Sequence, residues 1–187
     1  NKKEDKMIIL IGASASGKTE IAKILRTQGY KKCITTTTRP KRVNEIAGAD
    51  YYFVTKKEFN DLLLTNSFIE VTGYQNNLYG LQKKDLTVDG LVIVDPNGAN
   101  AILRVLGKEA FVVLIKSSKK LRKERMLKRK DKMEDIKIRL KKDDKIFKKR
   151  NISRVNLVLN NNDESLEKLA TIIKQKYQSY KIENLSQ

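Results

Sequence analysis

The sequence predicts an α/β fold in which a parallel β-sheet is flanked by helices. Short apolar runs rich in Val, Ile and Leu alternate along the 187-residue chain with longer amphipathic stretches. This rhythm is typical of strands joined by helical crossovers, and continuous apolar runs are typical of strands buried on both faces. The expected strands are Met7–Ile11, Cys33–Thr36, Leu91–Asp95, Phe111–Ile115 and Val155–Leu159.

The stretches between the apolar runs have the periodicity of helices. Ser118 and Asp163 are suited to N-caps, and Gly107 is suited to ending a helix. The expected helices are Lys18–Gln28, Gln82–Val88, Asn97–Leu106, Ser118–Arg129, Met133–Lys149 and Glu164–Tyr177.

The block from Arg39 to Gly80 departs from this alternation. Tyr51–Val54 and Phe68–Tyr74 are predicted strands of a small antiparallel unit. Between them, Thr55-Lys-Lys-Glu58 forms a capping box that opens a helix. Asn76-Asn77 marks a turn. We interpret this block as a small lobe inserted into the α/β core.

A complete G-x-x-x-x-G-K-[ST] motif follows the first expected strand and opens the first helix. Its glycines let backbone N–H groups surround a polyphosphate, its lysine adds a positive charge, and its last hydroxyl can bind Mg²⁺. The motif predicts a P-loop NTPase type of sheet that binds ATP, with Mg²⁺ on Thr19. The ATP-binding residues expected in the loop are Gly12, Ala13, Ser14, Ala15, Ser16, Gly17, Lys18 and Thr19.

The composition excludes several classes of protein. A hydrophobic content of 40% excludes overall disorder. The absence of histidine excludes Ser-His hydrolases and imidazole metal sites, and the single cysteine, Cys33, excludes a disulfide framework. We therefore expect a cytoplasmic protein. No apolar run approaches the roughly 20 residues that cross a bilayer, so we expect no membrane partner.

The charge is strongly positive, with a formal net charge of +18. Residues 116–150 contain 18 Lys and Arg against 6 Asp and Glu. Two explanations stay open: solvated helix faces in a lysine-rich protein, or attraction of polyanions such as nucleotide phosphates or RNA. Phe147 is the only aromatic residue in the segment, which argues against stacking on single-stranded bases. A nucleic-acid partner is therefore not expected.

A second phosphate-binding group is predicted at the start of the inserted lobe. Arg39 and Arg42 lie three residues apart, and Tyr51 follows closely. Guanidinium groups bind phosphate in a forked geometry, and a phenol can add a hydrogen bond. The alternative is a basic loop beside a core tyrosine.

Three arginines are candidates for a mobile lid over a phosphoryl group. Arg125 and Arg129 share a helix face, and Arg139 lies ten residues further along. Helical arginines are commonly solvated, but beside a phosphate loop they suggest a closing lid.

In combination, these motifs make the chain resemble the guanylate kinases from about Met7 to Lys174. The order is the phosphate loop, T-T-R-x-x-R, G-x-D-Y-x-F-V, F-x-E, Y-G, an aspartate after a buried strand, two lid arginines and V-x-N. The resemblance implies one domain with an inserted monophosphate-binding lobe and a helical lid. Its expected limits are about 1–38, 81–120 and 145–187 for the core, 39–80 for the lobe and 121–144 for the lid.

The resemblance also implies phosphoryl transfer from ATP to GMP, and to dGMP, with Mg²⁺. This role explains why a carboxylate stands at Glu70, because one carboxylate can accept hydrogen bonds from both the N1–H and the exocyclic amine of guanine. The implied GMP-binding residues are Thr35, Arg39, Arg42, Tyr51, Glu70 and Tyr79, and Asn160 is implied near the adenine of ATP. The implied catalytic residues are Lys18, Arg125, Arg129, Arg139 and Asp95. The oligomeric state is left open between monomer and homodimer.

The chain departs from the family pattern at three places. Leu81 stands where the family usually has a Ser or Thr that helps to hold guanine, so weaker guanine selectivity is expected. Ile93 stands where a second acid is usual, and Lys130-Asp131 replaces Gly-Thr in the lid. Three alternatives stay open: a related kinase with another nucleotide or phosphosugar acceptor, a non-catalytic phosphopeptide-binding module, and an RNA-binding protein.

Overall fold

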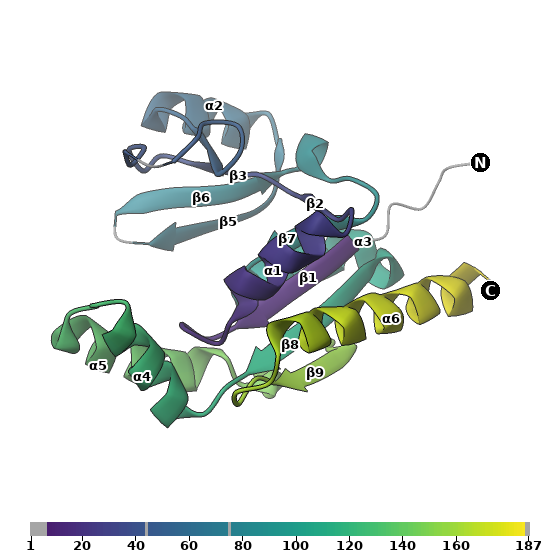
Figure 1. The fold of residues 1–187 in the computed structure, drawn as a ribbon. Coiled ribbons are helices and arrows are strands. Elements are labelled where there is room, and N and C mark those ends of the chain that lie inside the picture. The colour runs from purple at the N-terminus through teal and green to yellow at the C-terminus, as the bar shows by residue number, and fades with distance from the viewer. Residues whose placement is uncertain (1–6, 44, 75, 186–187) are drawn as a thin grey trace.

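A computed structural model describes residues 7–43, 45–74 and 76–185 of the chain and contains two β-sheets (Figure 1). The larger sheet has five strands in the order β2-β7-β1-β8-β9, and every neighbouring pair is parallel. Its strands are β1 (Met7–Gly12), β2 (Lys31–Lys32), β7 (Gly90–Ile93), β8 (Ala110–Lys116) and β9 (Leu157–Asn160). The predicted α/β class with a parallel sheet is confirmed.

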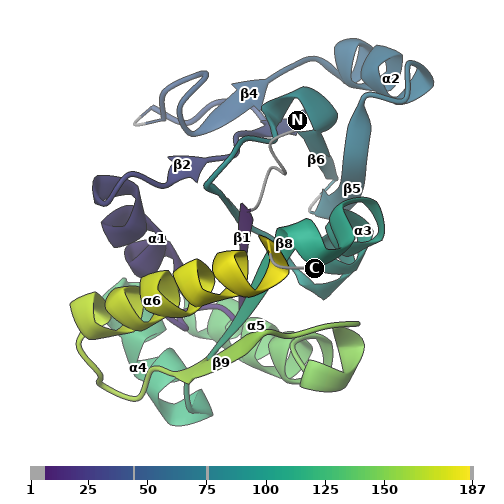
Figure 2. The same cartoon turned by 90° about the vertical axis from the view of Figure 1, so that its right-hand side faces the viewer.

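Side chains of the central strands alternate between two apolar layers. Ile8 and Leu10 of β1 pack into the layer beneath α1 and α6, whereas Ile9 and Ile11 pack into the layer beneath α3. Figure 2 shows α1 and α3 on opposite sides of the strands. Both faces of the sheet are covered, which explains why the strands lack polar alternation. These helices are α1 (Lys18–Thr27), α3 (Pro96–Leu106) and α6 (Leu166–Leu185).

The smaller sheet forms the inserted lobe, at the top of Figure 1, and has the strand order β4-β3-β6-β5. It is a mixed sheet, because β3 and β4 are parallel whereas the other pairs are antiparallel. The expectation of a purely antiparallel unit is corrected by this pairing. The predicted capping box is present, since Thr55 and Glu58 bond reciprocally at the helix start. The lobe elements are β3 (Thr35–Thr37), β4 (Tyr51–Phe53), α2 (Lys56–Leu64), β5 (Phe68–Tyr74) and β6 (Asn77–Gln82).

The prediction of a core strand over Cys33–Thr36 is wrong. In the core sheet the paired residues are Lys31–Lys32, followed by one hydrogen bond of 2.9 Å from Cys33 N–H to the carbonyl of Leu91, whereas Thr35–Thr37 pairs with β4 and β6 of the lobe. The side chains give the reason. The Thr36 hydroxyl is buried and accepts a hydrogen bond of 2.8 Å from the Gln82 amide, so the threonines have polar partners that an apolar core layer lacks.

The prediction of a helix over Gln82–Val88 is also wrong. The strand ladder continues past β6, because Lys83 N–H donates to the carbonyl of Ser67 at 2.9 Å. Only a single 3₁₀ turn follows, over Lys83–Asp85. Asp89 then has a φ of 53°, a left-handed conformation that no helix interior accommodates.

The C-terminal helix differs from its prediction at both ends. It begins three residues after Asp163, whose φ of 70° does not fit an N-cap. Instead, the hydroxyl of Ser165 accepts a hydrogen bond of 3.3 Å from Lys168 N–H.

Gly107 ends α3 with a φ of 51°, as predicted. The other expected core strands and helices are present with shifted ends.

Two helices, α4 (Lys119–Lys128) and α5 (Met133–Ile146), form a hairpin at the lower left of Figure 1. Ser118 is the N-cap of α4, as predicted, and accepts from Leu121 N–H at 3.2 Å. Met126, Ile136 and Leu140 form a small buried cluster between the helices, with Ala15 of the phosphate loop packed against it. The hairpin therefore has its own core and touches the loop directly.

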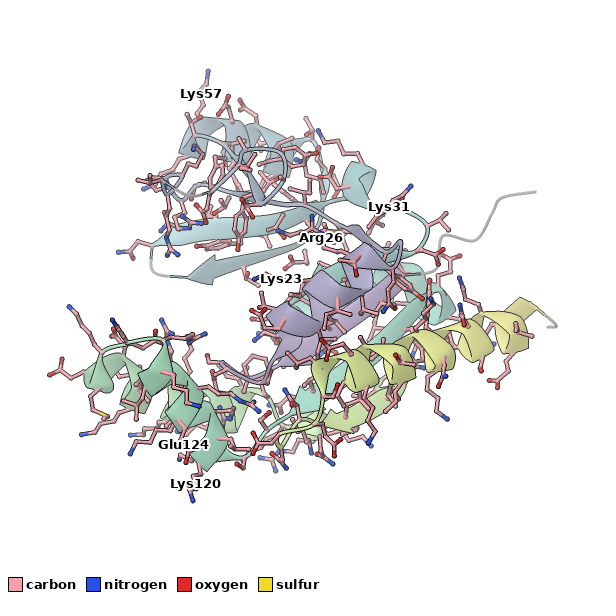
Figure 3. All side chains as sticks on the ribbon, in the orientation of Figure 1. Lys23, Arg26, Lys31, Lys57, Lys120 and Glu124 are labelled. Carbon is pink, nitrogen blue, oxygen red and sulfur yellow. The ribbon has the colours of Figure 1, made fainter. Side chains whose placement is uncertain are left out.

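The basic side chains are distributed over the molecule. Lys57 projects from the lobe and Lys120 from α4 at the opposite end, while Lys23 and Arg26 project from α1 (Figure 3). This distribution favours the solvated-surface explanation of the charge. None of the helices in the described part of the chain combines the length and apolar character needed to cross a membrane.

Candidate active site

The phosphate loop follows β1 and leads into α1, at the carboxyl end of the parallel sheet, where such folds bind ligands. Its shape depends on two glycines. A Cβ on Gly12 would lie 2.9 Å from the carbonyl oxygen of Ile115 and would clash with Ser16, and Gly17 has a φ of 92°. The loop borders a cavity of about 300 Å³, here called the loop cavity. Its lining residues are Ser14, Ala15, Gly17, Lys18, Thr19, Glu20, Arg125 and Arg129.

Hydrogen bonds from other elements hold the outer side of the loop. The buried Asn161 amide donates to the carbonyl of Ser16 at 2.9 Å. Arg125 donates to the carbonyls of Ala15 and Asn161, both at 3.0 Å, and to the Ser117 hydroxyl at 2.9 Å. Arg125 was predicted as a catalytic lid residue, and in this structure it joins the lid to the loop.

Asp143 of α5 adds a further contact to the loop. Its carboxylate accepts a hydrogen bond of 2.8 Å from Ser14 N–H and lies 3.7 Å from the buried guanidinium of Arg122. Neither Asp143 nor Asn161 lies in a recognisable motif. Charged residues spaced along an otherwise basic helix carry no signal of a contact that spans 129 positions of sequence.

Lys18 lies at the centre of the candidate site. Its ammonium donates to the carbonyl of Ala13 at 3.1 Å. Burial lowers the pKa of Lys18 to about 8, against the opposing effect of the Asp143 carboxylate. The side chain therefore remains mostly charged at pH 7. It lines both the loop cavity and a second, larger cavity.

The second cavity, here called the lobe cavity, has a volume of about 490 Å³ and lies between the lobe and the core. Four of the predicted GMP-binding residues line it together, and Asp95 joins them from the end of β7. The full lining is Lys18, Thr35, Tyr51, Glu70, Thr72, Gly73, Tyr79, Ile93, Val94, Asp95, Lys142 and Phe147.

Two carboxylates face this cavity in different surroundings. Burial, and to a lesser extent the nearby charge of Asp95, raises the pKa of Glu70 to about 7. A hydrogen bond from Leu81 N–H partly opposes this rise. Asp95 is the N-cap of α3 and accepts from Gly98 N–H at 2.7 Å, which fixes its carboxylate at the cavity wall.

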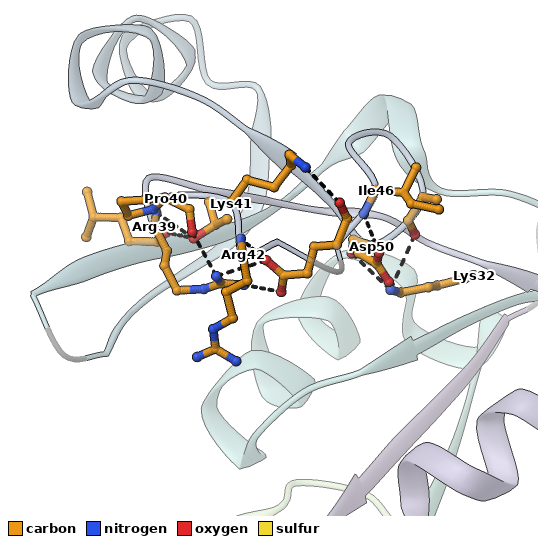
Figure 4. A network of polar contacts seen from close by, with 11 residues as sticks. Lys32, Arg39, Pro40, Lys41, Arg42, Ile46 and Asp50 are labelled. Carbon is orange, nitrogen blue, oxygen red and sulfur yellow. Dashed lines mark hydrogen bonds and ion pairs between the residues drawn. The ribbon is translucent and has the colours of Figure 1, made fainter.

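Arg39 of the predicted arginine–tyrosine group lies in a network of polar contacts at the lobe (Figure 4). Arg39 donates two hydrogen bonds, of 3.0 and 2.5 Å, to the carboxylate of Glu45. These bonds are the main reason why the pKa of Glu45 is lowered to about 2. The Arg39 guanidinium also lies 5.4 Å from the ring centre of Tyr51, and the ring centres of Tyr51 and Tyr79 are 6.1 Å apart. Glu45 thus occupies the fork in which a phosphate could bind.

Arg42 is held differently. Its backbone N–H donates to Glu45 at 2.8 Å, but its guanidinium extends away from this carboxylate (Figure 4). The side chain is exposed. Of the two arginines, Arg39 is therefore paired with a carboxylate, whereas the guanidinium of Arg42 is open to solvent.

The two remaining lid arginines meet at one carboxylate. Arg129, at the end of α4, lies 2.7 Å from Asp131, and Arg139 of α5 lies 3.2 Å from the same oxygen. Arg129 lines the loop cavity, whereas Arg139 is linked to it through Asp131. From the sequence, Asp131 was expected only as a departure from the family pattern, with no predicted contact to the arginines.

Comparison with known proteins places this geometry in a family. The model of the family described as "Guanylate kinase" matches residues 4–176. The chain belongs to the guanylate kinase family. A guanylate kinase of Mycoplasma mobile is 32% identical over 185 residues, which cover 90% of this chain and 92% of the relative. A guanylate kinase of Wolbachia sp. subsp. Brugia malayi is 28% identical over 180 residues, covering 91% and 92%.

A solved structure shows the same fold. The crystal structure of guanylate kinase from Anaplasma phagocytophilum superimposes with a TM-score of 0.66 at 24% identity, covering 95% of this chain and 87% of the other. The resemblance that the motifs indicated is confirmed, and this guanylate kinase is a nucleoside monophosphate kinase.

Asn160 lines neither of the two cavities, whereas Thr19 lines one of them. Asn160 lies exposed at the end of β9, beside the buried Asn161, and its assignment to ATP stays a prediction. Thr19 lines the loop cavity. Within the described ranges, no group of three or more His, Cys, Asp or Glu residues could cage a metal ion.

Proposed function

We propose that this guanylate kinase binds ATP in the loop cavity and GMP or dGMP in the lobe cavity. The observation that carries the proposal is that Lys18 lines both cavities. A phosphoryl group bound at the loop would then face an acceptor in the lobe cavity across one ammonium group. In-line displacement requires such an arrangement of donor and acceptor oxygens.

The base of the acceptor would be read by Glu70 and Thr35. An ionised Glu70 can accept both the N1–H and the exocyclic amine of guanine, whereas adenine presents an acceptor at its N1 position. Tyr51 and Tyr79 line the same cavity beside Arg39. They would hold the monophosphate together with Arg39 and Arg42.

Catalysis would come from positioning and positive charge, without a covalent intermediate. Lys18, Arg129 and Arg139 would stabilise the transferring group, and Arg125 would keep the loop joined to the lid. Asp95 would orient the acceptor from the cavity wall. Mg²⁺, bound with ATP beside Thr19, would neutralise charge on the phosphate oxygens.

Binding would draw the lobe, which extends over 35–82 from β3 to β6, and the lid (about 121–144) toward the core. In that step, Arg39 and Arg139 would exchange the carboxylates of Glu45 and Asp131 for phosphate oxygens. We further propose a cytoplasmic location, where both nucleotides are available.

A steady-state acceptor screen tests the proposal. With ATP and Mg²⁺, GMP should have the highest kcat/KM among GMP, AMP, CMP and UMP. Replacing Glu70 by Gln should lower kcat/KM for GMP by about 10- to 100-fold, the loss of a charge-assisted hydrogen bond worth about 1.5–3 kcal/mol. The exposed Glu183→Gln is the matched control and should leave the screen unchanged. No turnover of any monophosphate would contradict the proposal.

The pH dependence of GMP use gives a second prediction. Because the pKa of Glu70 is about 7, its carboxylate fraction rises between pH 6 and pH 8. The KM for GMP should therefore fall as pH rises through this window, by about fivefold to tenfold. GMP itself loses its second phosphate proton near pH 6, so Glu70→Gln should retain only that smaller dependence. An identical pH profile in wild type and variant would count against this role of Glu70.

A further inference from the structure

We propose that Thr72 is a specificity-determining residue whose hydroxyl donates a hydrogen bond to the O6 and N7 edge of guanine. The inference rests on the proposed binding of GMP in the lobe cavity. It concerns the edge of the base that Glu70 leaves unrecognised, and it bears on Leu81, which has no hydroxyl to offer there.

The strand geometry places Thr72 beside Glu70. The two residues are separated by one position on β5, so their side chains share one face of the lobe sheet. The ladder between β5 and β6 is regular here, with Glu70 opposite Leu81 and Thr72 opposite Tyr79. Both Glu70 and Thr72 line the lobe cavity. Thr72 therefore stands between the proposed base-reading carboxylate and the proposed phosphate-binding tyrosine.

The spacing suits a purine. Two strand residues advance the chain by about 6.6 Å, comparable to the width of a purine ring system. With guanine N1–H and the exocyclic amine on Glu70, the adjacent edge carries O6 and N7, which are both acceptors. A hydroxyl can donate to either of them. Burying these acceptors without a donor would cost binding free energy.

The hydroxyl of Thr72 is available for this role. Two other lobe threonines are used structurally: Thr36 accepts from Gln82, and Thr37 donates to a backbone carbonyl at 2.9 Å. Thr72, by contrast, is only half-buried, and its hydroxyl has no hydrogen-bond partner among the described residues. Thr72 therefore lines the cavity with a hydroxyl that has no structural hydrogen bond within the described part of the chain.

Leu81 offers nothing to the same edge of the base. It is fully buried in the apolar layer that contains Ile9, Val92 and Ile102. Its side chain thus serves the joint between lobe and core, and only its backbone N–H reaches Glu70. On this strand pair, a donor for O6 comes from β5 rather than from β6.

The test compares Thr72→Val, which keeps the shape but removes the hydroxyl, with Thr72→Ser, which keeps the hydroxyl. Thr72→Val should raise the KM for GMP and lower kcat/KM about tenfold, the effect of one hydrogen bond of about 1.4 kcal/mol. The kcat/KM for IMP, which shares O6 and N7 with GMP, should fall by the same factor. Thr72→Ser should stay within about twofold of wild type, and the KM for ATP should not change in either variant.

The outcomes separate this inference from the proposed function. Wild-type protein that fails to use GMP would overturn the proposed function itself. Wild-type protein that uses GMP, together with a Thr72→Val variant of unchanged GMP affinity, would overturn only the role of Thr72. A loss of kcat/KM for GMP that is not matched by IMP would also overturn it, because IMP carries the same O6 and N7 acceptors. Thermal unfolding of each variant checks that the lobe remains folded.

Discussion

Replacing Lys18 by methionine should lower kcat for GMP phosphorylation by about a hundredfold to a thousandfold, the usual loss when one preorganised donor to a transition state is removed. Lys18 lines both cavities and remains mostly charged at pH 7, so its ammonium would act where negative charge develops during transfer. The KM values for ATP and GMP should change much less than kcat. Single-turnover kinetics with both nucleotides bound would measure the chemical step directly.

Lys23→Met provides the matched control for this substitution. Lys23 lies one turn further along α1, is exposed, and pairs only weakly with Glu20 at 3.5 Å. Its loss should change neither kcat nor stability by more than a small amount, since exposed pairs are worth about 0–1 kcal/mol. A Lys18→Met enzyme with kcat within tenfold of wild type would show that the two cavities do not meet in catalysis as proposed.

The part of the site that sequence predicted best is the part fixed by local chemistry. The phosphate loop could be recognised because its shape depends on neighbouring residues: Gly12 and Gly17 occupy positions where a side chain would clash or be strained. The order of strands and helices also followed from local periodicity. Asp95 was implied by the resemblance to the guanylate kinases, and the structure places it as the N-cap of the Pro-led helix α3.

The parts that sequence did not predict depend on contacts between distant segments. Thr35 to Thr37 has the composition of a strand, but which sheet it joins is decided by β4 and β6. The contacts of Asn161 and Asp143 with the loop span more than a hundred positions. Glu45 is near Arg39 in sequence, yet only the turn between them shows that it fills the arginine fork.

These carboxylates share one physical role. The chain carries a formal charge of +18, and its proposed phosphate-binding arginines would repel each other and their basic surroundings. Glu45 holds Arg39, and Asp131 holds both Arg129 and Arg139. Each carboxylate is thus ion-paired with one or two arginines that would bind phosphate in the proposed reaction. For Arg39, Arg129 and Arg139, nucleotide binding would therefore exchange one anion for another rather than order free side chains, which would reduce the entropy lost on closure.

Replacing Arg139 by methionine should lower kcat by about a thousandfold, the lower end of the range for an arginine that contacts a transferring phosphoryl group. Arg139 comes from α5 and reaches the site beside Arg129 through Asp131. Stability should change little, because its pairing with Asp131 is partly exposed and worth at most about 1 kcal/mol. Steady-state kinetics and thermal unfolding of the same preparation would separate the two effects.

The Asp131→Asn variant tests whether Asp131 pairs with the lid arginines only before the phosphates bind, or also orients them during catalysis. If Asp131 only holds the arginines until phosphate arrives, the amide should weaken that hold and lower the KM for ATP by about twofold to tenfold, as expected for two exposed ion pairs. The gain should shrink with added salt, because exposed pairs are screened. A loss of kcat comparable to that of Arg139→Met would instead mean that Asp131 orients both arginines in the closed state. The sign of the Asp131→Asn effect thus reports whether the lid arginines are released or aligned by their carboxylate when the phosphates bind.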